Sequence, residues 1–216
     1  MRVNITLNHV RDALALENFD VVDAQLCMAP QARPIRRPAN MSGQARRASV
    51  LVLLFPTSAG LSLVLLRRAY NPRDVHSGQI SLPGGSREGN ETPVQTALRE
   101  TREELGVTEA VEILGTLGRL YVPPSDFEVR PVVGDVPARP LWQPGAGEVC
   151  DVLECPLQWL LDDAHKASGE MTEHGHIIHT PWYDVRGYRV WGATAIILSE
   201  FEQRLRRVLR RRPTLR

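Results

Sequence analysis

The sequence predicts an α/β protein in which helices flank a mixed β-sheet, giving a layered α/β/α sandwich. Two short runs rich in valine and leucine, residues 50–55 and 61–68, are separated by turn-forming residues and predict a hairpin of buried strands. A helix with clear start and stop signals is expected over residues 93–105, and strands are expected near residues 111–121 and 127–134. Because strands and helices alternate, the helices can cover both faces of one sheet.

The chain before the first strand is predicted to be an extension, so that residues 1–46 precede a single domain over residues 47–216. A short amphipathic helix is expected near residues 6–16. The segment rich in proline and arginine at residues 30–38 is expected to be a loop.

The remaining elements continue the alternation of strands and helices. A strand is expected over residues 78–82, before the central helix, and a short helix near residues 156–163. Two strands are then expected at residues 176–183 and 188–191, joined by a tight turn, and a last helix at residues 193–211. This order agrees with helices packed on a mixed sheet.

Composition argues against two classes of partner. A formal net charge of +1 over 216 residues gives no general attraction to nucleic acid or to an acidic membrane surface. The apolar stretch at residues 49–66 approaches the length of a membrane span, but Pro56 and Gly60 divide it into two strands. The arginines at residues 204–212 are expected at a solvated helix end, where they complement the helix dipole.

The cysteines and the N-terminus favour a cytoplasmic protein. Cys27, Cys150 and Cys155 match no zinc-finger spacing, and their odd number leaves one thiol outside any disulfide scheme, so reduced thiols are expected. The first residues lack the basic region and apolar run that are typical of a signal peptide.

The helix over residues 93–105 is predicted from local signals. Thr92 suits the N-cap, Pro93 suits the first helical position, and Gln95 completes a capping box with Thr92. Gly106 is a natural end for the helix.

Glu100, Glu103 and Glu104 fall within an arc of about 100° on one face of this helix. Like charges at this spacing repel one another, and the negative end of the helix dipole disfavours them further. Charges that destabilise their own helix, next to its apolar face, are typical of a functional site. Three carboxylates within reach of one point predict a site for a hard divalent cation, first of all Mg²⁺, which carboxylates usually hold together with substrate phosphates.

The loop and the helix together resemble the Nudix box. Gly85 is followed after five residues by Glu91, after seven more by Arg99 and Glu100, and then by Arg-Glu-Glu-Leu-Gly-Val at residues 102–107. This spacing matches the pattern G-x5-E-x7-R-E-U-x-E-E-x-G-U, with U a bulky apolar residue, at every charged and glycine position. Threonine replaces the usual apolar residue at position 101. The resemblance implies a Nudix hydrolase that cleaves a nucleoside diphosphate linked to another group, with Mg²⁺ or Mn²⁺ as cofactor.

Roles can be assigned to the acidic residues. Glu100 and Glu104 are the expected metal ligands, because the i,i+4 spacing brings them nearly into register along the helix. Glu103 is either a third ligand or a general base, and Glu148, from a separate loop, is the other candidate base. The sequence does not separate these two.

Three residues are expected to support the acidic face. Arg99 is expected to pair with Glu91 across the junction of loop and helix, and so to hold the acidic face in place. The resemblance to Nudix enzymes implies that the carbonyl group of Gly85 joins the metal ligands.

The residues before the box resemble the extra motif of coenzyme A pyrophosphatases. Its two arginines match Arg68 and Arg73, and its His-small-Gly-Gln run matches the residues from His76 to Gln79. There are two departures from the motif: one extra residue separates Arg73 from His76, and Leu82 replaces a phenylalanine. The resemblance implies that these arginines, His76 and Gln79 contact the substrate.

Further blocks continue this resemblance over roughly residues 45–200, and one of them, residues 121–127, adds Ser125 to the expected substrate contacts. There is also a physical case for Arg68 and Arg73. Guanidinium groups bind phosphates bidentately, and coenzyme A carries a 3′-phosphate besides its diphosphate.

The resemblance therefore implies hydrolysis of coenzyme A or an acyl-coenzyme A to 3′,5′-ADP and 4′-phosphopantetheine. Hydrolysis of ADP-ribose, another nucleotide sugar or a dinucleoside polyphosphate is the alternative, and a Nudix-fold module that binds a nucleotide without cleaving it is a third possibility. The expected partner is a small-molecule nucleotide, with no nucleic acid and no membrane, and the chain is expected to act as a monomer or homodimer.

Overall fold

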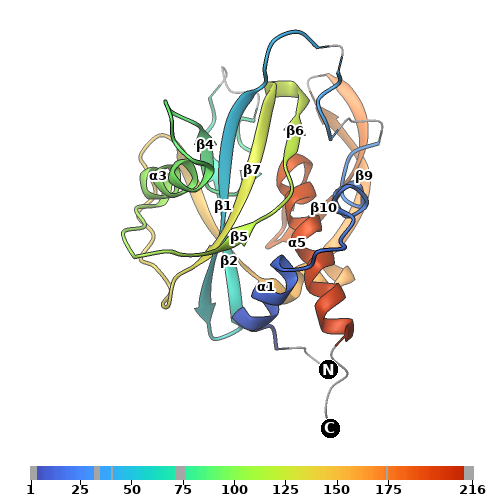
Figure 1. Ribbon diagram of the computed structural model, residues 1–216. Helices are drawn as coiled ribbons and strands as arrows, with labels where there is room; N and C mark the ends of the chain where they lie inside the picture. The colour runs from blue at the N-terminus through green and yellow to red at the C-terminus, as the bar shows by residue number, and fades with distance from the viewer. Residues whose placement is uncertain (1–3, 32–34, 40, 72–75, 174, 212–216) are drawn as a thin grey trace.

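The computed structural model describes residues 4–31, 35–39, 41–71, 76–173 and 175–211, and these form an α/β/α sandwich around a mixed sheet (Figure 1). The large sheet contains β1 (Arg46–Thr57), β2 (Gly60–Arg68), β3 (Ile80–Ser81), β4 (Gly84–Ser86), β5 (Glu112–Thr116), β6 (Leu120–Val122), β7 (Phe127–Asp135) and β8 (Val149–Pro156). A smaller sheet contains β9 (Lys166–Glu173), β10 (His176–Val185) and β11 (Tyr188–Val190). The helices are α1 (Leu7–Leu14), α2 (Val21–Leu26), α3 (Pro93–Leu105), α4 (Leu157–Leu161) and α5 (Gly192–Arg211), with 3-10 turns η1 (Pro123–Ser125) and η2 (Asp163–His165).

The central strand β1 makes the sheet mixed. It pairs antiparallel with β2, Leu54 opposite Leu63, as the predicted hairpin requires. On its other side it pairs parallel with β7, Phe127 standing opposite Arg46. Near its start it also pairs with the short strand β4, where Gly85 stands opposite Ser49.

Both faces of β1 are buried, because its side chains alternate between two cores. Leu51, Leu53 and Phe55 belong to the core under α3, whereas Val52 and Leu54 belong to the core under α5. These five side chains are fully buried. A strand covered on both faces is a continuous hydrophobic run, which is the pattern that the sequence shows here.

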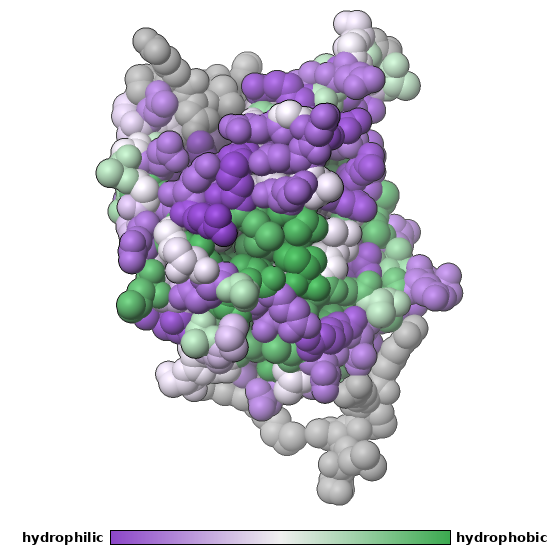
Figure 2. Space-filling model, turned by 60° about the vertical axis from the view of Figure 1, so that its left-hand side comes forward, coloured by the Kyte–Doolittle hydropathy of each residue, from purple (hydrophilic) through white to green (hydrophobic). Residues whose placement is uncertain are grey.

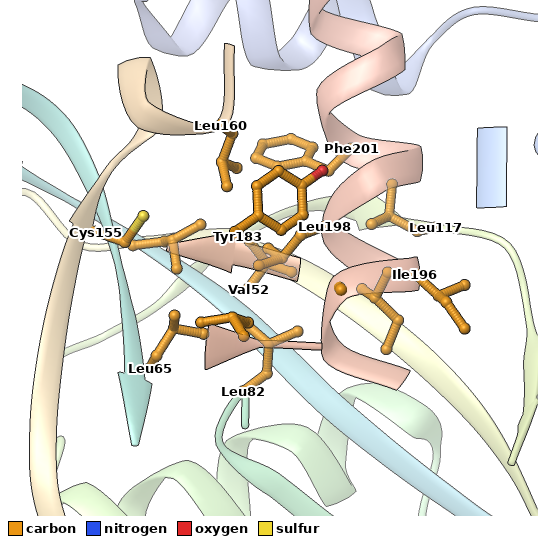
Figure 3. Close-up of a cluster of buried hydrophobic side chains, with 14 of the residues drawn as sticks. Val52, Leu65, Leu82, Leu117, Cys155, Leu160, Tyr183, Ile196, Leu198 and Phe201 are labelled. Atoms are coloured by element: carbon orange, nitrogen blue, oxygen red, sulfur yellow. The ribbon is translucent and has the colours of Figure 1, made fainter. Parts of the chain in front are cut away.

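The core under α5 joins elements from most of the chain. Figure 3 shows Val52 of β1, Tyr183 of β10 and Phe201 of α5 close together, with Cys155 of β8 beside them. Tyr183 keeps its hydroxyl paired, since it donates a hydrogen bond to the carboxylate of Glu202 at 2.5 Å. The buried ring can therefore contribute its apolar area without leaving a polar atom unsatisfied.

The described part of residues 1–46 packs on this same core. Helices α1 and α2 lie against α5, and the side chains of Val10 and Ala13 are fully buried. Gln25 of α2 donates to the buried carboxylate of Glu200 at 2.9 Å, and the hydroxyl of Ser199 donates to the carbonyl of Ala24 at 2.7 Å. The extension therefore shares the hydrophobic core, while the division of the chain at residue 46 stays a prediction.

The sequence predicts most elements but misplaces some. The strand expected over residues 111–121 is broken between β5 and β6, because the amide of Gly118 leaves the sheet and donates to both carboxylate oxygens of Glu200 at 3.0 Å. The strand expected over residues 78–82 contains only two residues, those of β3. Helix α2 and strands β4, β8 and β9 were not expected.

The C-terminal arginines differ from a purely solvated helix end. The inward face is as expected, because Leu205 and Val208 are buried. Arg204, however, pairs with Glu200 at 3.0 Å and is itself buried, and Arg206 pairs with Asp163 at 2.9 Å.

In the part of the chain that the structure describes, no helix is both long enough and apolar enough to cross a membrane.

Replacement of Val10 by alanine tests whether the extension belongs to the core. Because Val10 is fully buried, the free energy of unfolding should fall by about 2 kcal/mol, as measured by urea denaturation. Asn8→Ala, at an exposed position of the same helix, should change it by no more than about 0.5 kcal/mol. Equal effects of the two variants would show that α1 does not unfold together with the domain.

Candidate active site

Helix α3 begins and ends where its local signals predict. The hydroxyl of Thr92 accepts a hydrogen bond from the amide of Gln95 at 3.3 Å, and the Gln95 side chain accepts one from the amide of Thr92 at 2.8 Å, so the capping box is confirmed. Gly106 ends the helix in the left-handed conformation with φ of 67°. A β-carbon at this position would also lie 2.6 Å from the side chain of Gln143.

Arg99 holds the acidic face of α3 to the preceding loop. Its Nε donates to Glu91 at 2.8 Å, which confirms the predicted pair. One terminal nitrogen donates to Glu100 and to Glu103, both at 3.0 Å. The other donates to the carbonyl of Ser86 at 2.9 Å. A planar guanidinium with five donors can serve all these acceptors at once, which an ammonium group cannot.

Glu91 is the best-satisfied carboxylate of the loop. Besides Arg99, it accepts hydrogen bonds from the amide of Glu88 at 3.0 Å and from the hydroxyl of Thr96 at 2.9 Å. Arg99 first, and then these donors, lower the pKa of Glu91 to about 2. Glu91 therefore stays ionised and serves to fix Arg99.

Glu104 is the most deeply buried of the three helical carboxylates, with 7% of its side chain exposed. It accepts a hydrogen bond from the amide of Gly84 at 2.8 Å, and Arg68 approaches its other oxygen to 3.8 Å. Burial raises the pKa of Glu104 to about 7, with Glu100 and Glu148 adding negative charge nearby and Gly84 and Arg68 opposing the shift.

The glycines of β4 are required by close contacts. A β-carbon on Gly85 would lie 2.5 Å from the carboxylate of Glu100, so only glycine lets the strand come this close to α3. A β-carbon on Gly84 would lie 2.3 Å from the carbonyl oxygen of Ser49 on β1. In the structure these two glycines therefore permit β4 to pack closely against both β1 and α3.

Glu148 lies on a loop that is fastened to the end of α3. The amide of Gly145 donates to the carbonyl of Glu104 at 2.9 Å, and the amide of Ala69 donates to the carbonyl of Glu148 itself at 2.8 Å. Burial first, and then the negative charges of Glu103 and Glu148, raise the pKa of Glu100, while Arg99 opposes the shift. The fold thus brings this exposed carboxylate, which is distant in sequence, close enough to Glu100 and Glu104 to repel their negative charges.

No three His, Cys, Asp or Glu side chains of the described residues are arranged so that they could hold a metal ion. Glu103 in particular is 54% exposed and turned towards Arg99. The chemistry of the site nevertheless suits a hard cation. Burial raises the pKa of both Glu100 and Glu104, and Glu148 raises it further. A divalent cation would offset this excess of negative charge. Which of these residues bind it stays a prediction.

A cavity of about 580 Å³ adjoins the glycines of β4 and contains four of the predicted substrate residues, Arg68, His76, Gln79 and Ser125, in its lining. The ring nitrogens of His76 lie 3.3 Å from the Gln79 side chain and 3.3 Å from the Ser125 hydroxyl. Arg73, the fifth predicted contact, lies outside the described residues.

The cavity has an apolar part as well, formed by Leu82, Val129 and Ile197 among others. Figure 2, which turns the side bearing α3 and β4 forward, shows hydrophilic side chains around a smaller hydrophobic area. Mixed linings of this kind, with a few polar groups among apolar ones, are typical of small-molecule sites.

Comparison with known proteins agrees with the geometry. A family model described as the NUDIX domain matches residues 45–174. The chain belongs to the Nudix hydrolase family. A protein of Pectobacterium atrosepticum named "Uncharacterized Nudix hydrolase NudL" is 34% identical over 198 residues, which cover 87% of this chain and 93% of the relative. The protein of the same name from Salmonella paratyphi B is 36% identical over 146 residues, covering 64% and 72%.

Solved structures show the same fold. The Nudix hydrolase RenU from M. smegmatis has a TM-score of 0.51 at 18% identity, covering 88% of this chain and 97% of that one. A MutT protein from Methanosarcina mazei Go1 has a TM-score of 0.51 at 19% identity, covering 78% and 97%. At such identities the likeness concerns the fold alone, and the predicted Nudix fold is confirmed.

Sequence reasoning did not single out three residues that line the cavity, Arg46, Asp126 and Phe127. Arg46 stacks over the Phe127 ring, 4.0 Å from its centre. Asp126 and Phe127 belong to the block of resemblance at residues 121–127, which was a usable signal. Arg46 had none, because its place depends on the parallel pairing of β1 with β7.

Gly85→Ala should lower kcat/KM by about 100-fold, since the added methyl group must displace the Glu100 carboxylate and misplacement by about 1 Å has effects of this size. Thermal unfolding checks that the variant is folded. Gly169→Ala in β9 is the matched control, because a β-carbon there would make an ordinary contact, 3.4 Å from the Trp182 ring, and Gly169 is not among the residues that line the cavity. Full activity of Gly85→Ala would show that the closeness of β4 and α3 does not matter for the reaction.

Proposed function

We propose that this Nudix hydrolase is a Mg²⁺- or Mn²⁺-dependent pyrophosphatase of coenzyme A or its acyl derivatives, releasing 3′,5′-ADP and 4′-phosphopantetheine. The observation that carries the proposal is the cavity beside α3. Its lining joins Arg68, His76, Gln79 and Ser125, which match or adjoin the coenzyme A pyrophosphatase motif, to the two glycines that contact the glutamates of α3.

The cavity suits a nucleotide with an apolar appendage. Its volume falls within the range of about 300–1,000 Å³ that is usual for small-molecule sites. Arg68 stands next to Glu104, where a guanidinium can bind one phosphate of a diphosphate. The apolar lining can accept the less polar parts of the substrate.

The acidic groups would divide the chemical work. Glu100, Glu104 and the Gly85 carbonyl, with Glu103 as a further ligand, would hold the cation, which neutralises charge on the diphosphate. Glu148, or else Glu103, would take a proton from water as its oxygen bonds to phosphorus and the bond to the bridging oxygen of the diphosphate breaks. Arg99 would act by fixing the carboxylates, since it donates to Glu100 and Glu103.

Incubation with a panel of substrates tests the proposal. Coenzyme A, acetyl-coenzyme A, ADP-ribose, NADH and diadenosine polyphosphates are offered with Mg²⁺, with Mn²⁺ or with chelator, and mass spectrometry identifies the products. We expect 3′,5′-ADP and 4′-phosphopantetheine only when metal is present. Turnover of ADP-ribose without turnover of coenzyme A would overturn the substrate assignment, and tight binding without any turnover would indicate a nucleotide-binding module.

Glu104→Gln should lower kcat by at least about 100-fold, the size usual for loss of one group that stabilises a transition state electrostatically. Binding of Mn²⁺, measured by calorimetry, should weaken in the same variant. Glu109→Gln removes an exposed carboxylate just beyond α3 and should leave both quantities unchanged. Wild-type turnover in a folded Glu104→Gln protein is incompatible with the metal assignment.

A further inference from the structure

The segment that precedes β1 does not line the substrate cavity, but it contacts Asp126, a residue that does. We propose that Arg37 is a positioning residue for substrate binding: its ion pair with Asp126 fixes the turn η1, which holds Ser125 against His76. The inference rests on the proposed function in one respect, that a nucleotide binds in this cavity, and it does not depend on which nucleotide that is.

Arg37 joins two parts of the chain. Its Nε donates to Asp126 at 3.1 Å, across 89 residues of sequence. Its terminal nitrogens donate to the carbonyls of Met41 at 3.2 Å, Ser42 at 2.9 Å and Gly43 at 3.1 Å. One guanidinium therefore closes the loop of its own segment and binds the carboxylate of a cavity residue at the same time.

Asp126 needs this support because of its backbone. It caps η1 with φ of 48°, a left-handed conformation that is uncommon for residues other than glycine. The hydroxyl of the buried Tyr121 also donates to its carboxylate, at 3.0 Å. Arg37 first, and Tyr121 after it, lower the pKa of Asp126, so both partners favour the ionised form.

The turn leads directly to the predicted substrate contacts. The Ser125 hydroxyl lies 3.3 Å from Nε2 of His76, and the carbonyl of Ser125 accepts a hydrogen bond from Arg46 at 2.9 Å. The amide of Arg46 in turn donates to the carbonyl of Asp126 at 2.9 Å. A shift of Asp126 would therefore move Ser125 and loosen His76, both of which line the cavity.

The chemical step should be spared when this contact is lost. Glu100 and Glu104 are positioned by a different group of contacts, through Arg99 and Gly84. Arg37 is absent from the residues that line the cavity. An effect confined to η1 and His76 should therefore appear as weaker substrate binding with little change in turnover.

The neighbouring Arg36 provides a matched control. It likewise ties the segment to the domain, by donating to the Gln25 side chain at 3.0 Å and to the carbonyl of Arg119 at 2.6 Å. Among the described residues, these hydrogen bonds go to α2 and to the residue before β6 rather than to η1, and Arg36 is not among the residues that line the cavity. Loss of Arg36 should lower stability without altering the cavity.

The experiment compares Arg37→Ala with Arg36→Ala in the full chain, on whichever diphosphate compound the wild-type protein cleaves. We expect KM to rise about tenfold for Arg37→Ala, the size of one lost hydrogen bond to a charged group, with kcat within about twofold of wild type. Arg36→Ala should keep the wild-type KM even if its thermal unfolding temperature falls as much as that of Arg37→Ala. Equal KM values for the two variants, or a fall in kcat alone for Arg37→Ala, would overturn the proposal.

A double-mutant cycle tests whether Arg37 acts through Ser125. If it does, Arg37→Ala combined with Ser125→Ala should raise KM no further than Ser125→Ala alone. Strictly additive effects would show that the two residues act independently. Because the cycle uses the compound that is actually turned over, a failure of coenzyme A as substrate would overturn the proposed function without deciding the role of Arg37.

Discussion

The electrostatic cost of crowding carboxylates on α3 governs the arrangement of the candidate site. Glu100, Glu103 and Glu104 lie in the last turns of the helix, where the helix dipole and their mutual repulsion both oppose their negative charge. A single guanidinium, that of Arg99, donates to two of them and also to Glu91 and the carbonyl of Ser86. The contact that offsets the repulsion thus also fixes the loop relative to the helix. Within the described part of the chain, Glu104 accepts a hydrogen bond from the Gly84 amide and lies 3.8 Å from Arg68, whereas Arg99 donates to Glu100 and to Glu103.

The sheet makes this arrangement possible because β1 is buried on both faces. Its pairing with β4 places Gly85 opposite Ser49, and α3 packs across the face that contains Leu51 and Leu53. The glycine can then approach Glu100 more closely than any residue with a side chain could. The parallel pairing with β7 sets Phe127 opposite Arg46 and so brings the turn η1 to the same cavity. The single strand β1 therefore positions both the acidic face of α3 and the turn η1 that lines the cavity.

Features that depend on neighbouring residues could be predicted from the sequence. The limits of α3 follow from Thr92, Gln95 and Gly106, and the β1–β2 hairpin follows from two apolar runs around a turn. Strand β8 could not be recognised, because Asp151 and Glu154 interrupt its apolar residues and its identity as a strand comes from pairing with β2.

The same limit explains the errors in the fold and the omissions in the site. The expected strand over residues 111–121 breaks because Gly118 binds Glu200, which lies 82 residues further along the chain. Helical spacing places the three glutamates on one face of α3, whereas the contact of Glu103 with Arg99 could not be read from that spacing. Likewise the roles of Gly84 and Gly85 depend on which backbone and side-chain atoms approach them. Periodicity places a residue on a face, but only packing decides what it meets there.

The ion pair between Arg37 and Asp126 lies partly outside the region that the family model matches. That region, residues 45–174, contains α3, Glu148 and the turn η1, but neither Arg37 nor α5. The groups proposed for bond cleavage therefore lie within the matched region, while one support of the cavity wall comes from the segment before it. Asp126 adopts a left-handed conformation that a side chain normally disfavours, and its carboxylate is held by Arg37 and Tyr121. A turn stabilised in this way can change its geometry when the preceding segment changes, without disturbing the contacts of Arg99. A change in the segment before residue 45 would therefore act on the cavity through η1, while the contacts that fix the acidic helix stay the same.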